Sequence, residues 1–151
     1  MRIAITADHN ALALKAQLCD WLRDNGHLVD DRGIHRDAGT VDYPRLCADV
    51  AAQVLHNSAE HGVVLGGSGS GEAIACNKQA GIRAALCERV FTAEIARGHN
   101  DANVLVMGAK VVAPSLAERI LATWLSTPFK GGRHQVRLDQ IAALERGESL
   151  P

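Results

Sequence analysis

A glycine-rich segment with one carboxylate follows an apolar run at 62–65; it spans residues 66–72 and has the sequence GGSGSGE. Glycines let a backbone approach a ligand closely, and free N–H groups at the start of a helix attract anions. The segment therefore predicts a site for a phosphate or for an oxyanion that develops during a reaction. It lacks the Gly-Lys-Ser/Thr ending of a P-loop and does not complete a dinucleotide-binding fingerprint. The alternative is a tight turn that only packs a strand against a helix.

Two acidic residues lie where predicted strands end or helices begin. Glu72 lies just inside a helix predicted from about Gly71, where the helix dipole favours a carboxylate whatever its function. Asp8 and His9 directly follow the first apolar run. An acid beside an imidazole at this position can bind a sugar hydroxyl and a phosphate, although a helix cap beside a surface histidine gives the same pattern. Position alone leaves both interpretations open.

Imidazole and guanidinium groups gather in two further polar clusters. The segment 99–103, HNDAN, precedes an apolar run, and His99 can donate or accept a proton near neutral pH. A surface turn is the alternative there. The segment 131–137, GGRHQVR, opens the last predicted helix, and Arg133 and Arg137 share a helical face because they are four residues apart. Two guanidinium groups on one face suit a phosphate, and a solvated basic face is the alternative.

The elements that must position these residues alternate along the whole chain. Apolar runs predict strands at 1–7, 27–29, 62–65, 83–86 and 103–107. Between them lie a polar loop at 31–43 and helices predicted at 14–22, after Pro44, from about Gly71, at 91–97, at 115–125 and at about 136–147. This alternation indicates parallel βαβ units with helices on both faces of one sheet, in a single α/β domain over 1–151. Ligands of such sheets bind beyond the carboxyl ends of the strands.

The composition narrows the class of protein. The 151 residues suffice for one domain with a sizeable core, and a net charge of −1 provides no general attraction to nucleic acid or membranes. No apolar run approaches the roughly 20 residues that cross a bilayer, and the N-terminus lacks a signal-peptide pattern, so we expect a cytoplasmic protein. No Cys-x-x-Cys pair is present, so we expect buried thiols and no metal site from Cys19, Cys47, Cys76 and Cys87.

Read together, these segments resemble the ribose-5-phosphate isomerase B family, which also includes allose-6-phosphate and galactose-6-phosphate isomerases. The resemblance runs from Arg2 to about Ile141, and the motifs that carry it are Asp8-His9, 66–72, Asn77-Lys78, 81–86, 99–104 and Gly132-Arg133-His134. It implies an aldose–ketose isomerase without metal or other cofactor, on a Rossmann-like three-layer α/β/α sandwich with a five-stranded parallel sheet. It also implies a homodimer, in some members paired into a tetramer, whose sites combine residues from both subunits.

The resemblance also implies roles for individual residues. His99 helps to open the sugar ring, with Asp8 as its partner, and Glu72 is the base. The Ser68 hydroxyl is a further catalytic group, and Tyr43 and Asn100 line the substrate. The hole for the enediolate oxygen consists of the backbone amides of Gly67, Ser68, Gly69, Ser70 and Gly71. The phosphate contacts fall on His9, Lys110, Arg133 and Arg137.

Three positions depart from the family pattern. Many members carry a catalytic cysteine where this chain has Gly66, whereas a second branch uses the glutamate that matches Glu72. An arginine that binds phosphate is replaced by Lys110, which keeps the charge and loses bidentate geometry. The pattern Asp-His-Ala-Gly becomes Asp-His-Asn10-Ala11, which places a larger polar residue beside the site. These departures bear on the base and on substrate preference.

The predicted mechanism begins with ring opening by His99 and Asp8. Glu72 then removes the proton from C2, the loop amides hold the enediolate oxygen, and Glu72 returns the proton to C1. Ribose 5-phosphate and ribulose 5-phosphate, a pair of the pentose phosphate pathway, are the expected reactants. The alternatives are another aldose phosphate, a tetrose or a hexose, and a non-catalytic module that binds a phosphorylated metabolite. A carboxylate beside the anion pocket favours the enzyme, because a pure anion binder gains nothing from it.

Overall fold

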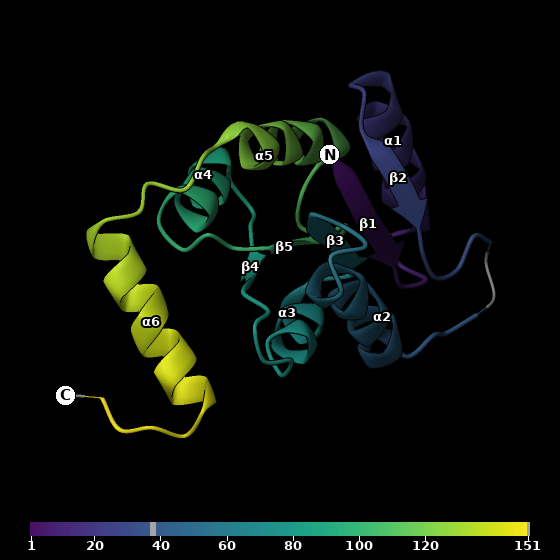
Figure 1. Cartoon of the computed structure of the whole chain (residues 1–151). Coiled ribbons are helices and arrows are strands. Elements are labelled where there is room, and N and C mark those ends of the chain that lie inside the picture. Colours follow the sequence, from purple (N-terminus) through teal and green to yellow (C-terminus); the bar gives the residue numbers. More distant parts are fainter. Residues whose placement is uncertain (37–38, 151) are drawn as a thin grey trace.

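Five parallel strands form a single sheet in the order β2-β1-β3-β5-β4, as Figure 1 shows for the computed structural model of this chain. The structure describes residues 1–36 and 39–150. The strands are β1 (Arg2–Ala7), β2 (Leu28–Asp31), β3 (His61–Gly66), β4 (Ala84–Leu86) and β5 (Val104–Gly108). The helices are α1 (Leu12–Asp24), α2 (Tyr43–Leu55), α3 (Ser70–Cys76), α4 (Val90–Gly98), α5 (Pro114–Ser126) and α6 (Arg133–Glu145). This architecture confirms the α/β fold with a five-stranded parallel sheet.

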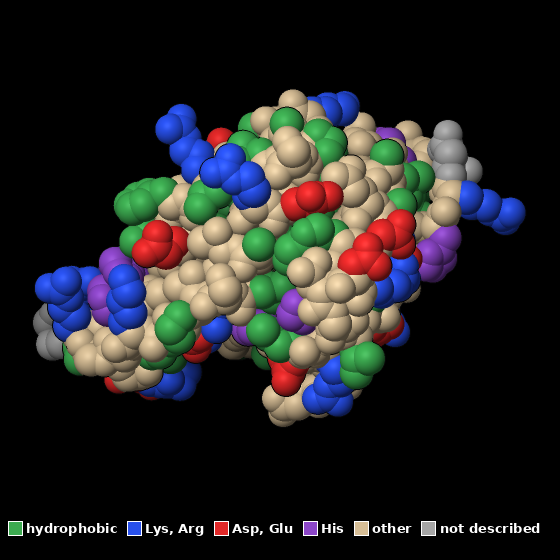
Figure 2. Space-filling view, turned by 90° about the horizontal axis from the view of Figure 1, so that it is seen from above, with side chains coloured by type: hydrophobic (Ala, Val, Ile, Leu, Met, Phe, Trp, Pro, Cys, Tyr) green, Lys and Arg blue, Asp and Glu red, His purple; other side chains and the backbone are tan. Residues whose placement is uncertain are grey.

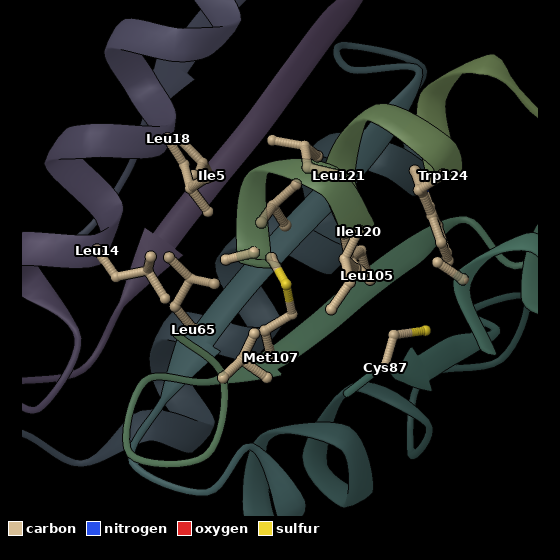
Figure 3. Close-up of a cluster of buried hydrophobic side chains, with 14 of the residues drawn as sticks. Ile5, Leu14, Leu18, Leu65, Cys87, Leu105, Met107, Ile120, Leu121 and Trp124 are labelled. Carbon is tan, nitrogen blue, oxygen red and sulfur yellow. The ribbon is translucent and has the colours of Figure 1, made fainter. Parts of the chain in front are cut away.

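Helices cover both faces of the sheet and so complete three layers: α1, α4 and α5 lie on one face, and α2 and α3 on the other (Figure 1). The first face carries the larger apolar cluster. There Ile5, Leu65 and Met107, from β1, β3 and β5, pack with residues of α1 and α5 (Figure 3). Because both faces are covered, β3 and β5 are buried at nearly every position, which is why they are almost continuously apolar in sequence.

The strand register brings the ends of three strands to the same edge of the sheet. Ala7 at the end of β1 pairs with Leu65 of β3, and Gly66 at the end of β3 pairs with Gly108 at the end of β5. The residues that follow these strands therefore start from neighbouring points. This edge is where an open parallel sheet binds its ligands.

The second strand is longer than the sequence predicts. It spans Leu28–Asp31 rather than 27–29 and so includes two carboxylates. Asp31 pairs with Ile5 of β1, and the buried Lys15 side chain of α1 donates to the Asp31 carboxylate. An edge strand tolerates acidic residues when a cation satisfies them, and that cation comes from the helix that precedes the strand in the chain.

The helices begin one to three residues earlier than predicted, as α3 and α6 illustrate. α3 starts at Ser70 rather than at about Gly71. α6 spans Arg133–Glu145 rather than about 136–147, because two glycines with φ near +60° turn the chain directly into the helix and Gly147, with φ of 74°, follows its end. Residues 37 and 38 of the predicted polar loop, and residue 151 of the predicted domain, lie outside the described residues.

Helix α6 lies apart from the three layers (Figure 1). A groove of about 560 Å³ separates it from the sheet edge at β4; Ile82 and Ala84 line one side, and Ile141 and Leu144 of α6 line the other. Within 1–36 and 39–150, no helix is long and apolar enough to cross a membrane.

Candidate active site

The side chain of Asp8 is held rigidly at the carboxyl end of β1. It is 6% exposed, and its backbone N–H donates to the carbonyl of Leu65 in β3 at 3.0 Å. Asn10 binds both carboxylate oxygens: its backbone N–H donates to Oδ1 at 2.8 Å, and its side-chain Nδ2 donates to Oδ2 at 2.9 Å. The same Nδ2 lies 3.2 Å from Nε2 of His9. Asn10 therefore orients the carboxylate, a role that sequence reasoning missed.

The glycine loop between β3 and α3 packs against the turn that follows β5. The backbone N–H groups of Ala109 and Lys110 donate to the carbonyls of Gly66 at 2.8 Å and Gly67 at 3.0 Å. A Cβ on Gly108 would meet the backbone of Ser68, so the two segments can approach this closely only without a side chain there. The alternative of a packing turn thus explains part of the loop. It does not explain Gly67 and the residues after it that line a pocket.

Glu72 lies in the first turn of α3, with its carboxylate next to Gly66. A Cβ on Gly66 would collide with that carboxylate. The Glu72 residue is 4% exposed. Burial, and the negative charge of Asp8, raise the pKa of Glu72 above its ordinary value of 4.5, although a backbone hydrogen bond acts in the opposite direction. A carboxylate whose pKa moves toward neutrality is a better general base, because it binds a proton more strongly.

Asp8 and Glu72 border a pocket of about 430 Å³ at this edge of the sheet. The segment before α2 forms another wall: the Val41 N–H donates to Nδ1 of His9 at 3.3 Å, and Gly71 lies against the Tyr43 hydroxyl, which a Cβ would meet. The residues that line the pocket are Asp8, His9, Asn10, Thr40, Val41, Asp42, Tyr43, Gly67, Ser68, Gly71 and Glu72. Sequence reasoning placed Asn10 beside the site but missed the segment 40–42, for which a polar loop composition was the only signal.

Three other residues assigned to this region lie beside the pocket without lining it. Gly69, with φ of 81°, precedes α3 and is buried against Leu86 and the end of β5. The backbone N–H of Ser70 donates to the hydroxyl of Ser68 at 3.3 Å, so the loop in this state already uses one of the amides predicted to bind the oxyanion. The side chain of Lys110 is exposed just after β5.

The remaining predicted site residues lie elsewhere in the chain. His99 follows α4, before β5, and therefore belongs to the opposite edge of the sheet from Asp8. Its ring stacks on His134 of α6, with ring centroids 4.0 Å apart and planes 16° from parallel. Arg133 and Arg137 are exposed on α6. Basic side chains gather at the left end of the molecule in Figure 2, the end at which α6 lies in Figure 1. One chain alone therefore does not bring together the two expected ring-opening partners.

The polar turn that follows His99 is built mainly by ion pairs. Arg97 donates to the Asp101 carboxylate at 2.8 Å, and Arg83 donates to the same carboxylate at 3.1 Å. Asn103 accepts the backbone N–H of Arg83 at 2.8 Å, while Asn100 is exposed and its carbonyl accepts from the Arg83 side chain at 3.1 Å. For Asp101 and Asn103 the surface-turn interpretation is therefore correct. Their contacts fix the backbone from which His99 projects.

The four thiols are free and buried, as the sequence predicts. Burial raises the pKa of Cys19 and of Cys87 to about 11, and a hydrogen bond with Cys76, together with burial, raises the pKa of Cys47. Across residues 1–36 and 39–150, no group of three or more His, Cys, Asp and Glu side chains has the arrangement that could hold a metal ion.

Comparison with known proteins assigns the chain to a family. The family model described as Ribose/Galactose Isomerase matches residues 3–141. The chain belongs to this isomerase family. Among its curated members, ribose-5-phosphate isomerase B of Escherichia coli (strain K12) is 39% identical over 145 residues, which cover 96% of this chain and 97% of that protein.

Solved structures of isomerase family members have the same fold. The ribose-5-phosphate isomerase B of Clostridium thermocellum superposes with a TM-score of 0.95 at 42% identity and covers 99% of this chain and 100% of its own. The enzyme of Mycoplasma genitalium, solved with bound ribulose-5-phosphate, superposes with a TM-score of 0.92 at 36% identity, over 96% of each chain. The family match over residues 3–141 includes every residue that lines the pocket, and the solved structures share the fold that positions it.

Proposed function

We propose that this chain interconverts ribose 5-phosphate and ribulose 5-phosphate through an enediolate, with Glu72 as the base. The observation that carries the proposal is the buried Glu72 carboxylate, which borders the same pocket as Asp8 and the glycine loop and has a raised pKa. The E. coli relative bears the name of this activity, and the M. genitalium relative holds the ketose product. The reaction is a step of the pentose phosphate pathway, and its phosphorylated reactants fit a cytoplasmic location.

The proposed isomerisation moves one proton from C2 to C1 through Glu72 and one hydroxyl proton from the C2 oxygen to the C1 oxygen, and it needs no external reactant. As the sugar ring opens, the bond from C1 to the ring oxygen breaks, the ring oxygen gains a proton and the C1 hydroxyl loses one. Glu72 then takes the proton from C2, and backbone N–H groups of the glycine loop stabilise the enediolate oxygen. Glu72 returns its proton to C1 to give the ketose. Positioned proton transfer contributes a factor of about 10² to 10⁴ to such a rate.

The electrostatics of the pocket support a site completed by a second copy of the chain. Of the described residues that line it, none is Lys or Arg, and three, Asp8, Asp42 and Glu72, carry carboxyl groups. A phosphate dianion placed there needs cationic partners. Arg133, Arg137 and His99 are solvent-accessible at another part of the chain. A homodimer in which one copy presents these three to the pocket of the other supplies the missing charge.

Exposed apolar side chains support the same assembly. Ile74 of α3 and Phe91 of α4 are 64% and 66% exposed, and Val136 and Leu144 of α6 are 59% and 57% exposed. Leu144 also lines the groove between α6 and the sheet edge. Exposed apolar patches mark surfaces that another protein covers. A second copy that packs here would cover α6, the helix that carries the two arginines, and would fix their position.

A coupled assay across four-, five- and six-carbon aldose phosphates tests the proposed substrate. We expect the highest kcat/KM with ribose 5-phosphate, and loss of that activity in Glu72→Gln. A higher kcat/KM with a tetrose or hexose phosphate would reassign the substrate and leave the isomerase chemistry in place. A chain that binds ribose 5-phosphate but neither isomerises it nor exchanges its C2 proton with solvent would be a binding module instead.

A further inference from the structure

His134 has no part in the mechanism described above, yet it is the most buried residue at the start of α6. It is 7% exposed, whereas its neighbours Arg133 and Gln135 are exposed. Its ring lies flat against His99, with centroids 4.0 Å apart and planes 16° from parallel. The stack joins the proposed ring-opening residue to the helix of the phosphate-binding arginines.

Backbone contacts from two distant segments build this stack. α4 ends at Gly98, and the His99 N–H donates to the carbonyl of Ile95 at 2.9 Å. The Lys130 N–H donates to the carbonyl of Gly98 at 2.9 Å, which anchors the start of α6 beside the end of α4. The two glycines after Lys130 then turn the chain with φ near +60°. The position of His134 over His99 is thus determined by the backbone as well as by the rings.

The surroundings of His134 disfavour the protonated form of its imidazole. Partial burial lowers the pKa of His134, and so do His99, Arg133, Arg137 and Lys130 around it. The positive end of the α6 dipole acts in the same direction, since His134 lies in the first turn. A neutral ring can stack on His99 in either protonation state, whereas two imidazolium rings would repel each other. His134 therefore offers His99 a flat contact, and its lowered pKa disfavours a second imidazolium in the stack.

We propose that His134 is a positioning residue that holds the His99 ring in the orientation required for ring opening, and that it contributes to neither proton abstraction nor phosphate binding. The proposal rests on the proposed function, in which His99 assists that step. Loss of the stack leaves His99 free to rotate, so the proton it exchanges with the sugar oxygens is misplaced. A misplacement of about 1 Å in a reacting group can cost about 10²-fold in rate.

The chemistry of the substrates separates ring opening from the later steps. Ribose 5-phosphate is mostly a closed ring, whereas ribulose 5-phosphate is open, because its C5 oxygen is esterified and cannot close a five-membered ring on C2. Exchange of the C1 hydrogen of ribulose 5-phosphate with solvent therefore reports Glu72 and the enediolate without ring opening. Turnover of ribose 5-phosphate reports both. A residue that only supports the fold would affect both measurements equally.

The test compares His134→Ala, which removes the stacking surface, with His134→Phe, which keeps a flat ring without a titratable group. We expect His134→Ala to lower kcat for ribose 5-phosphate at least 10-fold, with exchange into ribulose 5-phosphate and KM within about 2-fold of the unmodified protein. His134→Phe should retain most of the turnover. Both variants are compared at matched unfolding temperature and oligomeric state.

Several outcomes would overturn the proposal. Equal losses of turnover and exchange in His134→Ala would show a general structural role, and a raised KM with unchanged kcat would show a phosphate contact. A His134→Phe variant as poor as His134→Ala would show that an imidazole nitrogen is needed instead of a flat ring. His99→Asn serves as the reference: if it leaves turnover of ribose 5-phosphate unchanged, the assignment of His99 fails, and the proposal for His134 fails with it while the isomerase activity stands.

Discussion

The carboxylate of Glu72 lies in the space that a side chain on Gly66 would fill. The two residues come from different elements, the end of β3 and the first turn of α3. A thiol on residue 66 and this carboxylate orientation therefore exclude each other. The two arrangements that the family resemblance implies, a cysteine at the end of the strand or a glutamate on the helix, are alternative occupants of one space at the edge of the pocket. In this chain the glutamate occupies it.

Substitution of Gly66 should disable the base without unfolding the protein. A Cβ in Gly66→Ala meets the far end of a flexible side chain, so Glu72 rotates away at small cost in stability. We expect turnover to fall about 10²-fold, with little change in the unfolding temperature. Steady-state kinetics and thermal unfolding measure the two effects. Normal turnover in Gly66→Ala would show that the carboxylate position does not matter.

A double substitution extends this test. In Gly66→Cys/Glu72→Ala the space is free for a thiol, so we expect more turnover than in Gly66→Ala/Glu72→Ala, and sensitivity to thiol alkylation. The unmodified protein and Cys76→Ala should resist alkylation, because the native thiols are buried. An unmodified protein that alkylation inactivates without unfolding would assign the chemistry to a native cysteine instead.

The raised pKa of Glu72 predicts opposite effects of Glu72→Gln on activity and on stability. Turnover should fall by about 10²-fold or more, because glutamine cannot accept the proton. The folded protein binds the Glu72 proton more tightly than the unfolded chain does, so the stability from this group is complete below about pH 4.5 and is lost as pH rises through the raised pKa. Glutamine escapes that loss. Thermal unfolding of Glu72→Gln should therefore match the unmodified protein at acid pH and exceed it at neutral pH.

The pH dependence of activity gives an independent measure of the same pKa. The base must be ionised, so the acid limb of kcat/KM should lie above the ordinary glutamate value of 4.5. Asp8 raises this pKa through its charge, and Asp8→Asn should move the limb to lower pH besides slowing ring opening. An acid limb of kcat/KM that does not move in Asp8→Asn would show that the charge of Asp8 does not affect the pKa of Glu72.

The two arginines of α6 should act through phosphate binding. Loss of one charge-assisted contact costs about 1.5–3 kcal/mol, so Arg133→Ala or Arg137→Ala should raise KM about 10- to 150-fold. Arg146→Ala is the matched control, because Arg146 directly follows the same helix and pairs with Glu148 at 2.6 Å. Its KM should be unchanged. Unchanged kinetics in both test variants would remove these arginines from the site, and Lys110→Ala should have a smaller effect than either.

Mixed dimers test whether Glu72 and His99 of different subunits share a site. In a purified heterodimer of Glu72→Gln with His99→Asn, one of the two composite sites is intact, and we expect its activity to return. The control heterodimer pairs an unmodified subunit with Glu72→Gln/His99→Asn, and it should be inactive because each composite site lacks one residue. Activity in the control and none in the test pair would place both residues in one chain's site.

Much of the fold and part of the site follow from local sequence patterns. The alternation of apolar runs and periodic segments predicts the five parallel strands, because a strand covered on both faces must be apolar at nearly every position. The glycine segment predicts a loop at a ligand-binding edge, since close backbone approach requires residues without side chains. The sequence by itself thus determined the fold class, the family and the pocket residues Asp8, His9 and Glu72.

Only the tertiary structure decided how residues remote in sequence meet. That Glu72 lies over Gly66 and that α6 begins early enough to place His134 on His99 depend on how the elements pack. No local pattern encodes those contacts. A residue's type indicates its backbone preference and its polarity, whereas the residue that it contacts depends on how other elements pack. For the same reason the separation of His99 and Asp8 within one chain emerged only from the fold.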